Sequence, residues 1–239
     1  MTASPDLSLQ RTARVTGLLF LLSLFVPMLN WVLVNAKVIV PGNADETLRR
    51  VLAHGGLFRL GLVGDLVTAA IAVGLALGLY VLLKPVHRSW SQVAFGLKMV
   101  EGVLMAAIAL GNFAVFLVVS EPGMVTGLGV GQMGHLAGLF FLTRMPLAAI
   151  PMFFLGLNFT IFLSLLYRSG YVPKWLAAFG VVSYLLILKY SLLTLLLPDL
   201  ASIVAIQSLC WAPSCLFELV IGIWLLTKGV FSMEGVVDA

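Results

Sequence analysis

Five ionisable side chains stand inside long apolar stretches of this sequence, where charged residues are otherwise rare. They are Asp65, Lys98, Glu101, Lys189 and Glu218. An isolated charge is costly in an apolar medium, so such groups usually pair with one another or bind protons and polar ligands. Glu101 and Glu218 are the candidate proton donors or acceptors, because a carboxyl group in apolar surroundings can act as a general acid.

The spacing of the polar residues places them on a few helix faces. At about 100° per residue, three helices each carry a polar stripe. The stripes are Lys98, Glu101 and Asn112; Arg144 and Asn158; and Gln207, Ser214 and Glu218. A rise of about 1.5 Å per residue sorts the side chains into two tiers. The upper tier contains Asp65, Asn112, Lys189 and, a little higher, Gln207, and the lower tier contains Lys98, Glu101, Asn158 and Glu218.

Each tier predicts an ionic interaction. We expect Asp65 to pair with Lys189, and Lys98 to face both Glu101 and Glu218. The lower tier has one carboxylate more than it has cations, so the set should retain one proton. The predicted binding residues are Asp65, Lys98, Asn112, Arg144, Asn158, Lys189 and Gln207.

Composition and apolar runs predict the helices that position these residues. Of 239 residues, 61% are hydrophobic and 10% are charged, and the mean hydropathy is +1.11, which excludes an ordinary soluble domain. Six apolar stretches can cross a bilayer as helices. They are residues 15–34, 58–83, 90–119, 145–167, 175–197 and 202–227. We therefore expect an all-α integral membrane protein, a six-span bundle forming a single membrane domain over 1–239. Gly74 and Gly78 favour close helix packing within that bundle.

Positive charges predict the orientation, with both termini on the cytoplasmic side. With six spans, the inner side collects Arg11, Arg14, Lys84, Arg88, Arg168, Lys174 and Lys228, and the outer side collects Lys37, Arg49, Arg50, Arg59 and Arg144. The first span is too long for a secretory signal core of roughly 7–15 residues. The glycine-rich residues 121–144 are predicted to form an extra interfacial or re-entrant segment, since a seventh span there would reverse the charge bias.

The outer loop contains the pattern of a short amphipathic helix at about 43–53. Asn43 followed by Glu46 resembles a capping box. Asp45 and Arg49, and Glu46 and Arg50, have the spacing of helical ion pairs.

Several other chemistries are excluded by context. Residues 129–134 match a dinucleotide-binding fingerprint, but no strand precedes them and no acidic residue follows at the required distance. His54, His87 and His135 lack the spacing of a metal site, and Cys210 and Cys215 have no second pair. We therefore expect no metal and no cofactor. The basic residues are scattered at span ends, so we also expect no nucleic-acid partner.

The order of several short motifs resembles one known family. The motifs are Arg11-Thr-Ala-Arg14, Ile39-Val-Pro-Gly42, Phe58-Arg-Leu-Gly61 with Asp65-Leu66, Tyr80-Val-Leu-Leu-Lys-Pro85, Lys98-x-x-Glu101 and Tyr167-Arg-Ser-Gly-Tyr-Val-Pro173. They make most of the chain similar to the bacterial membrane proteins catalogued as domain of unknown function 4386. That family has Arg where Lys98 stands, and often His where Arg144 and Asn158 stand. The resemblance implies a multi-spanning bacterial membrane protein and implies no activity.

Three functions remain open. The first is a polar intramembrane cavity that binds or transports a small or lipophilic molecule, with or without proton coupling. The second is an intramembrane acid–base enzyme of the isomerase or cyclase type acting on a lipophilic substrate. The third is a structural, sensory or partner-stabilising protein in which Asp65, Lys98 and Lys189 set helix register. The partner in every case is the lipid bilayer of the cell (cytoplasmic or inner) membrane, and the sequence leaves the oligomeric state open.

Overall fold

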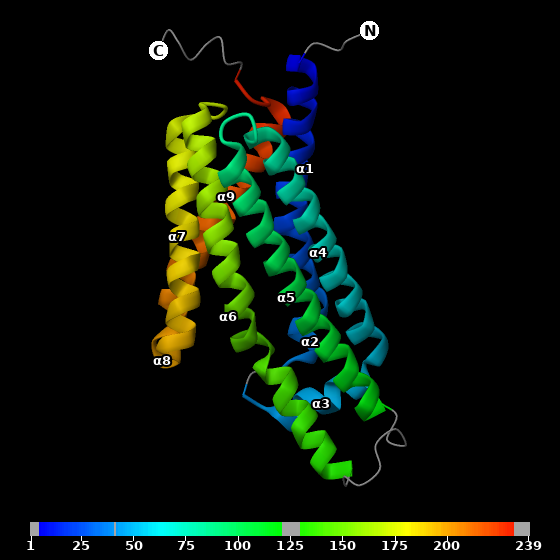
Figure 1. Cartoon of the computed structure of the whole chain (residues 1–239). Helices are drawn as coiled ribbons and strands as arrows, with labels where there is room; N and C mark the ends of the chain where they lie inside the picture. The colour runs from blue at the N-terminus through cyan, green and yellow to red at the C-terminus, as the bar shows by residue number, and fades with distance from the viewer. Residues whose placement is uncertain (1–4, 41, 121–129, 232–239) are drawn as a thin grey trace. The chain divides into compact units, whose positions relative to one another are not determined.

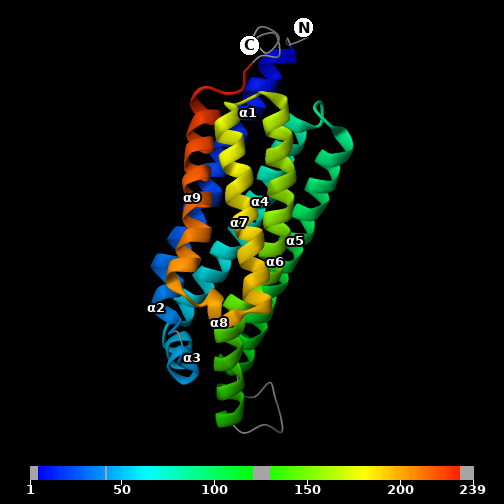
Figure 2. The same ribbon diagram turned by 90° about the vertical axis from the view of Figure 1, so that its left-hand side faces the viewer.

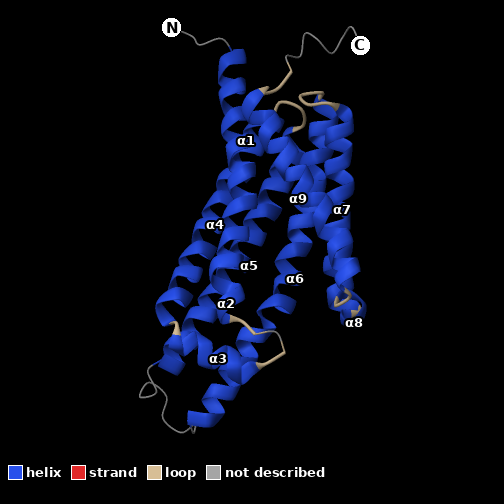
Figure 3. Ribbon diagram, turned by 180° about the vertical axis from the view of Figure 1, so that it is seen from behind, coloured by secondary structure: helices blue, strands red, loops and turns tan. Residues whose placement is uncertain are grey.

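The computed structural model describes residues 5–40, 42–120 and 130–231, and the regular structure in these ranges is entirely helical (Figure 1, Figure 3). The elements are α1 (Pro5–Asn30), the π-helical turn η1 (Trp31–Asn35), α2 (Ala36–Val38), α3 (Ala44–Ala53), α4 (Gly55–Leu83), α5 (Arg88–Ser120), α6 (Val130–Ser169), α7 (Lys174–Leu196), α8 (Pro198–Ala201) and α9 (Val204–Thr227).

Within the described residues, six helical stretches are long and apolar enough to cross a membrane, and this confirms the predicted number. Their bounds are Leu7–Val38, Gly55–Leu83, Arg88–Ser120, Ala137–Ser169, Lys174–Leu196 and Val204–Thr227. Each exceeds the roughly 20 residues that a bilayer requires. The first stretch continues from α1 through η1 and α2. These six helices indicate a multi-pass membrane protein.

The fourth span begins earlier than its sequence predicts. The apolar pattern places its start at Met145, whereas α6 is already helical through residues 130–144. The glycines that suggest a break instead permit close packing on α3. A Cβ atom at Gly138 would lie 2.5 Å from the carbonyl oxygen of Ala44, and one at Gly134 would lie 2.9 Å from the Leu48 side chain. Residues 121–129 lie outside the described ranges, and an interfacial or re-entrant path there stays a prediction.

The chain divides into two compact units. Unit 1 comprises residues 1–24, 70–102 and 149–239, and unit 2 comprises residues 25–69 and 103–148. Four helices, α1, α4, α5 and α6, contribute one segment to each unit. Helices α7, α8 and α9 belong to unit 1, and η1, α2 and α3 belong to unit 2.

Small residues bring the helices of unit 1 close together. Helices α1 and α9 meet at Gly17, where a Cβ atom would lie 2.8 Å from the carbonyl oxygen of Gly222. Helices α7 and α9 lie side by side (Figure 1, Figure 2), and Gly180 of α7 leaves room for a phenylalanine ring of α9. Gly78 of α4 faces Thr16 of α1, so its packing is within the chain, as predicted. Such contacts let backbones approach where lipid provides no hydrophobic drive.

The segment that follows α9 is tied to two other parts of unit 1. Gly229 has a φ of +71°, which turns the chain after the helix. The side chain of Gln10 then donates to the Val230 carbonyl at 2.5 Å and accepts from the Val230 N–H at 3.2 Å. The Phe231 N–H donates to the carbonyl of buried Tyr171 at 3.0 Å. The end of α9 is therefore held against α1 and the turn between α6 and α7.

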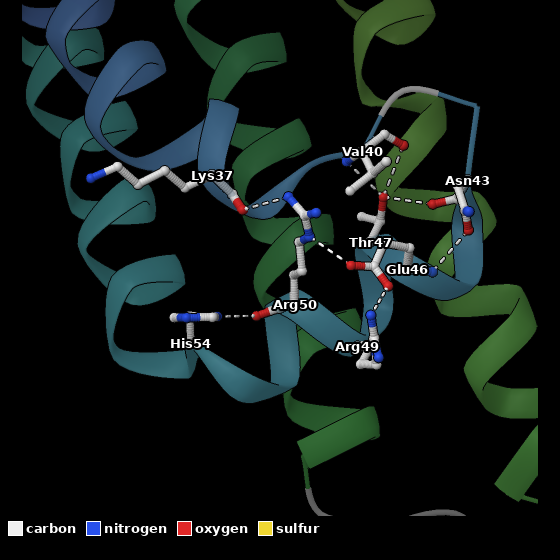
Figure 4. A network of polar contacts seen from close by, with 8 residues as sticks. All are labelled: Lys37, Val40, Asn43, Glu46, Thr47, Arg49, Arg50 and His54. Carbon is white, nitrogen blue, oxygen red and sulfur yellow. Dashed lines mark hydrogen bonds and ion pairs between the residues drawn. The ribbon is translucent and has the colours of Figure 1, made fainter.

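In unit 2, helix α3 begins with the cap that the sequence predicts (Figure 4). The Asn43 side chain accepts a hydrogen bond of 2.9 Å from the Glu46 N–H. The buried Thr47 hydroxyl accepts from the Val40 N–H at 2.9 Å and lies 2.8 Å from the Asn43 carbonyl. These bonds satisfy groups at the start of α3 and fix the preceding loop on it.

The ion pairs of α3 centre on Glu46 (Figure 4). Its carboxylate binds Arg50 at 2.8 Å and also binds Arg49. The predicted partner of Arg49 was Asp45, and that prediction is wrong, because a spacing of three residues on a helix serves as well as a spacing of four. Asp45 instead lies 3.6 Å from the Nδ1 atom of His135. The hydrogen bond from Arg50, and to a smaller extent the one from Arg49, holds the pKa of Glu46 below its ordinary value of 4.5.

The interior of unit 2 is aromatic. The Phe58 ring packs against Phe116 at 5.1 Å and against Phe141 at 5.3 Å between ring centroids. All three rings are nearly fully buried, and Val51 of α3 is buried in the same cluster. The Arg59 guanidinium lies 5.3 Å from the centroid of the Phe116 ring. This cluster joins α4, α5 and α6 within the unit.

Candidate functional site

Lys98 and Glu101 form a buried ion pair on α5, in unit 1. The Lys98 Nζ atom lies 2.7 Å from Oε1 and 2.9 Å from Oε2 of Glu101. The side chains are only 5% and 8% exposed, so water contributes little screening. The three-residue spacing puts both groups on one helix face, and the predicted pairing is formed.

Asn158 of α6 joins this pair from a second helix. Its Nδ2 atom donates to Glu101 Oε2 at 2.8 Å and to the carbonyl of Phe154, four residues earlier on α6, at 2.6 Å. The side chain is fully buried. Both amide hydrogens are used, and the Oδ1 atom has no hydrogen-bond partner among the described residues. Asn158 thus stabilises the Glu101 carboxylate and keeps one acceptor unused.

Two stacked rings connect the ion pair to helix α7. The Lys98 ammonium lies 4.9 Å from the centroid of the Phe159 ring, within the range of a cation–π interaction. The Phe159 ring stacks on Tyr184 with centroids 4.3 Å apart and planes inclined by 11°. Both rings are buried. Phe159 therefore contacts the cation and the phenol at once.

Glu218 of α9 is the second carboxyl group of the cluster, and its direct partner is the hydroxyl group of Tyr184, which donates a short hydrogen bond to its Oε1 atom. The nearby Ser23 hydroxyl of α1 donates instead to the Phe20 carbonyl at 2.8 Å. Lys98 and Glu101 act on Glu218 through longer-range electrostatic interactions. Among the side chains that the structure describes, no cation lies within ion-pair distance of Glu218.

The cluster lies deep in the helices that carry it. At about 1.5 Å per residue, Lys98, Tyr184 and Glu218 are each ~14–15 Å from the nearer end of their helices, about half of a 30 Å hydrocarbon core. One ammonium group and two carboxyl groups share this region of unit 1. The arrangement can hold one ion pair and, beside it, one exchangeable proton.

An apolar groove lies on the same unit, between α7 and α9. Its volume is about 310 Å³, and it is shallow and largely open to the surroundings. Its lining residues are Phe179, Ser208, Leu209, Ala212, Pro213 and Leu216. Phe179 packs edge-to-face against Phe217 at 6.4 Å, and Phe217 packs in the same way against Tyr184 at 6.2 Å. The groove is thus connected to the polar cluster through buried rings.

The whole helical assembly can be compared with known proteins. A family model described as "Domain of unknown function (DUF4386)" matches residues 15–229, which is nearly the full chain. The chain belongs to this family. No curated protein and no solved structure gives a significant match. The chain is therefore a membrane-like helical bundle of a family without an assigned activity, as the resemblance in its motifs predicts.

One motif that carries the family resemblance forms the turn between α6 and α7. Gly170 has a φ of +66°, a conformation that favours glycine after a helix. Tyr171 and Val172 are buried, and Pro173 directly precedes α7. In this DUF4386 chain the motif therefore has a structural explanation: it makes the tight turn that connects two spans.

The four residues predicted for the lower tier come together. Lys98, Glu101 and Asn158 are in direct contact, and Glu218 lies beside them through Tyr184 and longer-range electrostatics. Sequence reasoning missed Tyr184, although a tyrosine in the middle of an apolar span needs a partner for its hydroxyl group. That requirement was the signal available for finding it.

The residues predicted for the upper tier lie in different units. Asp65 belongs to unit 2, where its carboxylate accepts a 3.0 Å hydrogen bond from Asn30 Nδ2. Lys189 belongs to unit 1 and is exposed on α7. The ion pair between Asp65 and Lys189 stays a prediction.

The remaining candidates, Asn112, Gln207 and Arg144, lie on three different helices. Asn112 is buried in unit 2. Gln207 is exposed on α9. The backbone of Arg144 lies in α6, and its side chain is outside the described part of the structure. The described residues contain no group of three or more His, Cys, Asp or Glu side chains that could hold a metal ion.

Proposed function

We propose that this protein binds and moves a small or lipophilic molecule across the membrane, coupled to a proton carried by Glu218. The observation that supports this most strongly is the environment of the Glu218 carboxyl group. It accepts a hydrogen bond from the Tyr184 hydroxyl, while the nearby ammonium of Lys98 is already bound by Glu101.

Charge balance supports a proton on Glu218. If both carboxyl groups were ionised, the cluster would have one uncompensated negative charge in apolar surroundings, which is strongly unfavourable. Protonation of Glu218 leaves a neutral set made of an ion pair, a carboxylic acid and a phenol. Glu101 keeps its charge, because it has the direct contacts with Lys98 and Asn158.

The same contacts offer a way to couple proton transfer to a structural change. When Glu218 loses its proton, its new charge attracts Lys98, which is then shared between two carboxylates. Lys98 also touches Phe159, and Phe159 stacks on Tyr184. A shift of Lys98 would therefore act on α5, α6, α7 and α9 of unit 1, giving the two-state element that coupling requires.

The groove between α7 and α9 supports a lipophilic ligand. Its lining is almost entirely apolar, and the packed rings of Phe179, Phe217 and Tyr184 connect it to Glu218. A molecule from the bilayer could therefore bind there without crossing a charged surface and influence the acid through these rings. The proposed setting is the cell membrane, with both termini on the cytoplasmic side, as the distribution of Lys and Arg favours.

The same groove also favours one alternative, an acid–base enzyme in which Glu218 protonates a lipophilic substrate held there. The two functions differ in whether a proton crosses the bilayer. An enzyme returns its proton to the side from which it came, whereas a carrier releases it on the other side.

Proton movement in sealed liposomes tests the proposal. The purified protein is reconstituted with a pH-sensitive dye inside, and an acid pulse is applied with the membrane potential clamped. Glu218→Gln should slow dye acidification by about tenfold or more, equivalent to a barrier raised by about 1.4 kcal/mol. Glu46→Gln is the matched control, because this carboxylate lies outside the spans and should leave the rate unchanged.

If the wild-type protein and Glu218→Gln acidify at the same rate as empty liposomes, the transport proposal is wrong. The enzyme alternative then remains if infrared spectra still detect a protonated Glu218. A fully ionised Glu218 at neutral pH would exclude both functions and leave the structural interpretation.

A further inference from the structure

Asn112 in unit 2 is a buried polar side chain without a partner. It stands in the second half of α5 and is 1% exposed. Neither Nδ2 nor Oδ1 of its amide has a hydrogen-bond partner among the described residues. Within a membrane span, each unsatisfied polar group costs several kcal/mol because no bulk water can replace the missing bond. None of the described residues therefore satisfies this amide.

Asn112 does not use the solution that other polar residues of the spans adopt. Asn158 bonds to a carbonyl four residues earlier on its own helix, and Thr16 and Thr68 do the same. Asn112 forms no such bond. Its amide is therefore presented to the interior of the unit rather than returned to the α5 backbone.

The described surroundings of Asn112 are aromatic. Phe116, one turn along α5, packs on Phe58 of α4, and Phe141 of α6 closes the same cluster. The neighbouring Gly111 faces the Phe140 ring, where an added Cβ atom would come within 2.9 Å. These contacts near Asn112 on α5 are all with phenylalanine rings, which have no hydrogen-bonding group to offer.

The unit also has a second polar position at a similar level. Asn30 donates to Asp65 and to the Gly61 carbonyl, each at 3.0 Å. Because α4 and α5 run antiparallel with Phe58 beside Phe116, the helix rise puts Asp65 and Asn112 within ~5 Å of each other along the helix axes. Unit 2 therefore carries polar side chains at this level along its helices and an apolar cluster at the level of the three phenylalanine rings.

We propose that Asn112 binds a hydroxyl group inside unit 2, either of an internal water molecule or of a lipophilic alcohol. A primary amide offers one acceptor oxygen and donor hydrogens side by side, and a hydroxyl group both donates and accepts. One hydroxyl group can thus satisfy both amide atoms. A ketone would leave the Asn112 oxygen unpaired, and an ion would meet no compensating charge on this residue. This binding site does not depend on the proton chemistry of Glu218.

The first test measures contact between the Asn112 amide and water in the unmodified protein. The protein is labelled with ¹⁵N-asparagine in detergent micelles, and the Asn112 side-chain resonance is assigned by its loss in Asn112→Ser. Magnetisation transfer from water to this resonance, at a level not seen for the helical backbone amide of the same residue, identifies a bound water molecule.

The second test uses 1-dodecanol as the probe and dodecane as the matched compound without a hydroxyl group. Dodecanol should bind wild-type protein and raise its unfolding temperature, while dodecane should not. Asn112→Leu should weaken dodecanol binding by about tenfold or more, the ratio that one lost buried hydrogen bond produces. Leu110→Ala, an exposed position on the same helix, should leave binding unchanged.

Water transfer without a dodecanol effect supports the proposal with water as the source, and a dodecanol effect lost in Asn112→Leu supports the alcohol. If wild-type protein responds to neither probe, the proposal is overturned. An Asn112→Leu protein more stable than wild type would agree with that negative result, because it would mean that the amide was merely unsatisfied.

Discussion

Tyr184 of α7 donates its phenolic hydrogen to the carboxyl group of Glu218 on α9, while its ring stacks on Phe159 of α6. One side chain thus joins three helices of unit 1 by two kinds of interaction. The hydrogen bond satisfies a hydroxyl group that has no water available. The stack places the Tyr184 ring against Phe159, whose ring also contacts the Lys98 ammonium.

The protonation state of the two carboxyl groups is the first prediction. Infrared spectra at neutral pH should contain the C=O band of one protonated carboxyl group, and Glu218→Gln should remove it. Glu101→Gln should also remove that band, because Lys98 would lose its anion and charge balance would then favour an ionised Glu218. A spectrum with both groups ionised, titrating near the ordinary glutamate value of about 4.3, would contradict the charge-balance argument.

Removal of the Tyr184 hydroxyl group should destabilise the protein and slow proton movement. Tyr184→Phe preserves the ring stack but leaves the Glu218 carboxyl group short of a donor, at an expected cost of about 1–3 kcal/mol. Unfolding in detergent measures the free energy, and the liposome assay measures the rate. The control is Tyr190→Phe. The Tyr190 hydroxyl donates to the Ala201 carbonyl at 3.1 Å and takes no part in the cluster. Equal effects of the two variants on the proton rate would argue against a specific role for Tyr184.

The ion pair between Lys98 and Glu101 should behave as a coupled unit. Lys98→Met alone leaves a buried carboxylate without its cation and should cost about 3–5 kcal/mol. The double variant Lys98→Met with Glu101→Gln should be more stable than Lys98→Met, because it removes the unpaired charge. A double-mutant cycle from unfolding free energies measures this coupling. Additive effects would mean that the two side chains do not interact in the membrane.

Helix α3 should lose stability as the pH falls. In the folded helix, Arg50 and Arg49 hold the pKa of Glu46 below its ordinary value of 4.5, so the unfolded segment binds protons more readily than the folded one. The stabilisation is therefore complete above the ordinary value and disappears as the pH falls through the lowered one. Amide hydrogen exchange of residues 44–53 should accelerate in this acidic window. Glu46→Gln should remove the dependence, and an unchanged profile in that variant would assign it to another group.

Two glycines of α4 provide a matched test of helix packing in unit 1. A Cβ atom at Gly78 would collide with the Thr16 hydroxyl and lie 3.3 Å from its Cβ atom, whereas one at Gly74 would make ordinary contact with Leu19 at 3.5 Å. Gly78→Ala should therefore destabilise the protein by about 1–3 kcal/mol. Gly74→Ala should have little effect or a small stabilising one. If the unfolding free energies of the two variants agree, α1 and α4 are less closely packed than this contact requires.

Local patterns in the sequence were sufficient for the helices and for part of the site. Long apolar runs predict six spans because backbone groups in lipid must bond within a helix, and the spacing of Lys98 and Glu101 predicts their pair because one helix positions both residues. The cap of α3 at Asn43 follows from local chemistry in the same way. These features depend on neighbours in the chain, which a sequence displays directly.

Other features depended on contacts between distant segments, and these only the tertiary structure decided. By composition, Gly134 and Gly138 suggest a break in the helix. In the structure they are helical, and α3 packs closely on them. Tyr184 reaches Glu218 across 34 positions of sequence, and Asn158 reaches Glu101 across 57. Asn112 has the same residue type as Asn158, but only the packing around each amide determines that one is bonded and the other is not. Sequence determined which groups are buried in the membrane, and the packing of helices determined which of them meet, because helix faces can be assigned from spacing whereas the partner of each face cannot.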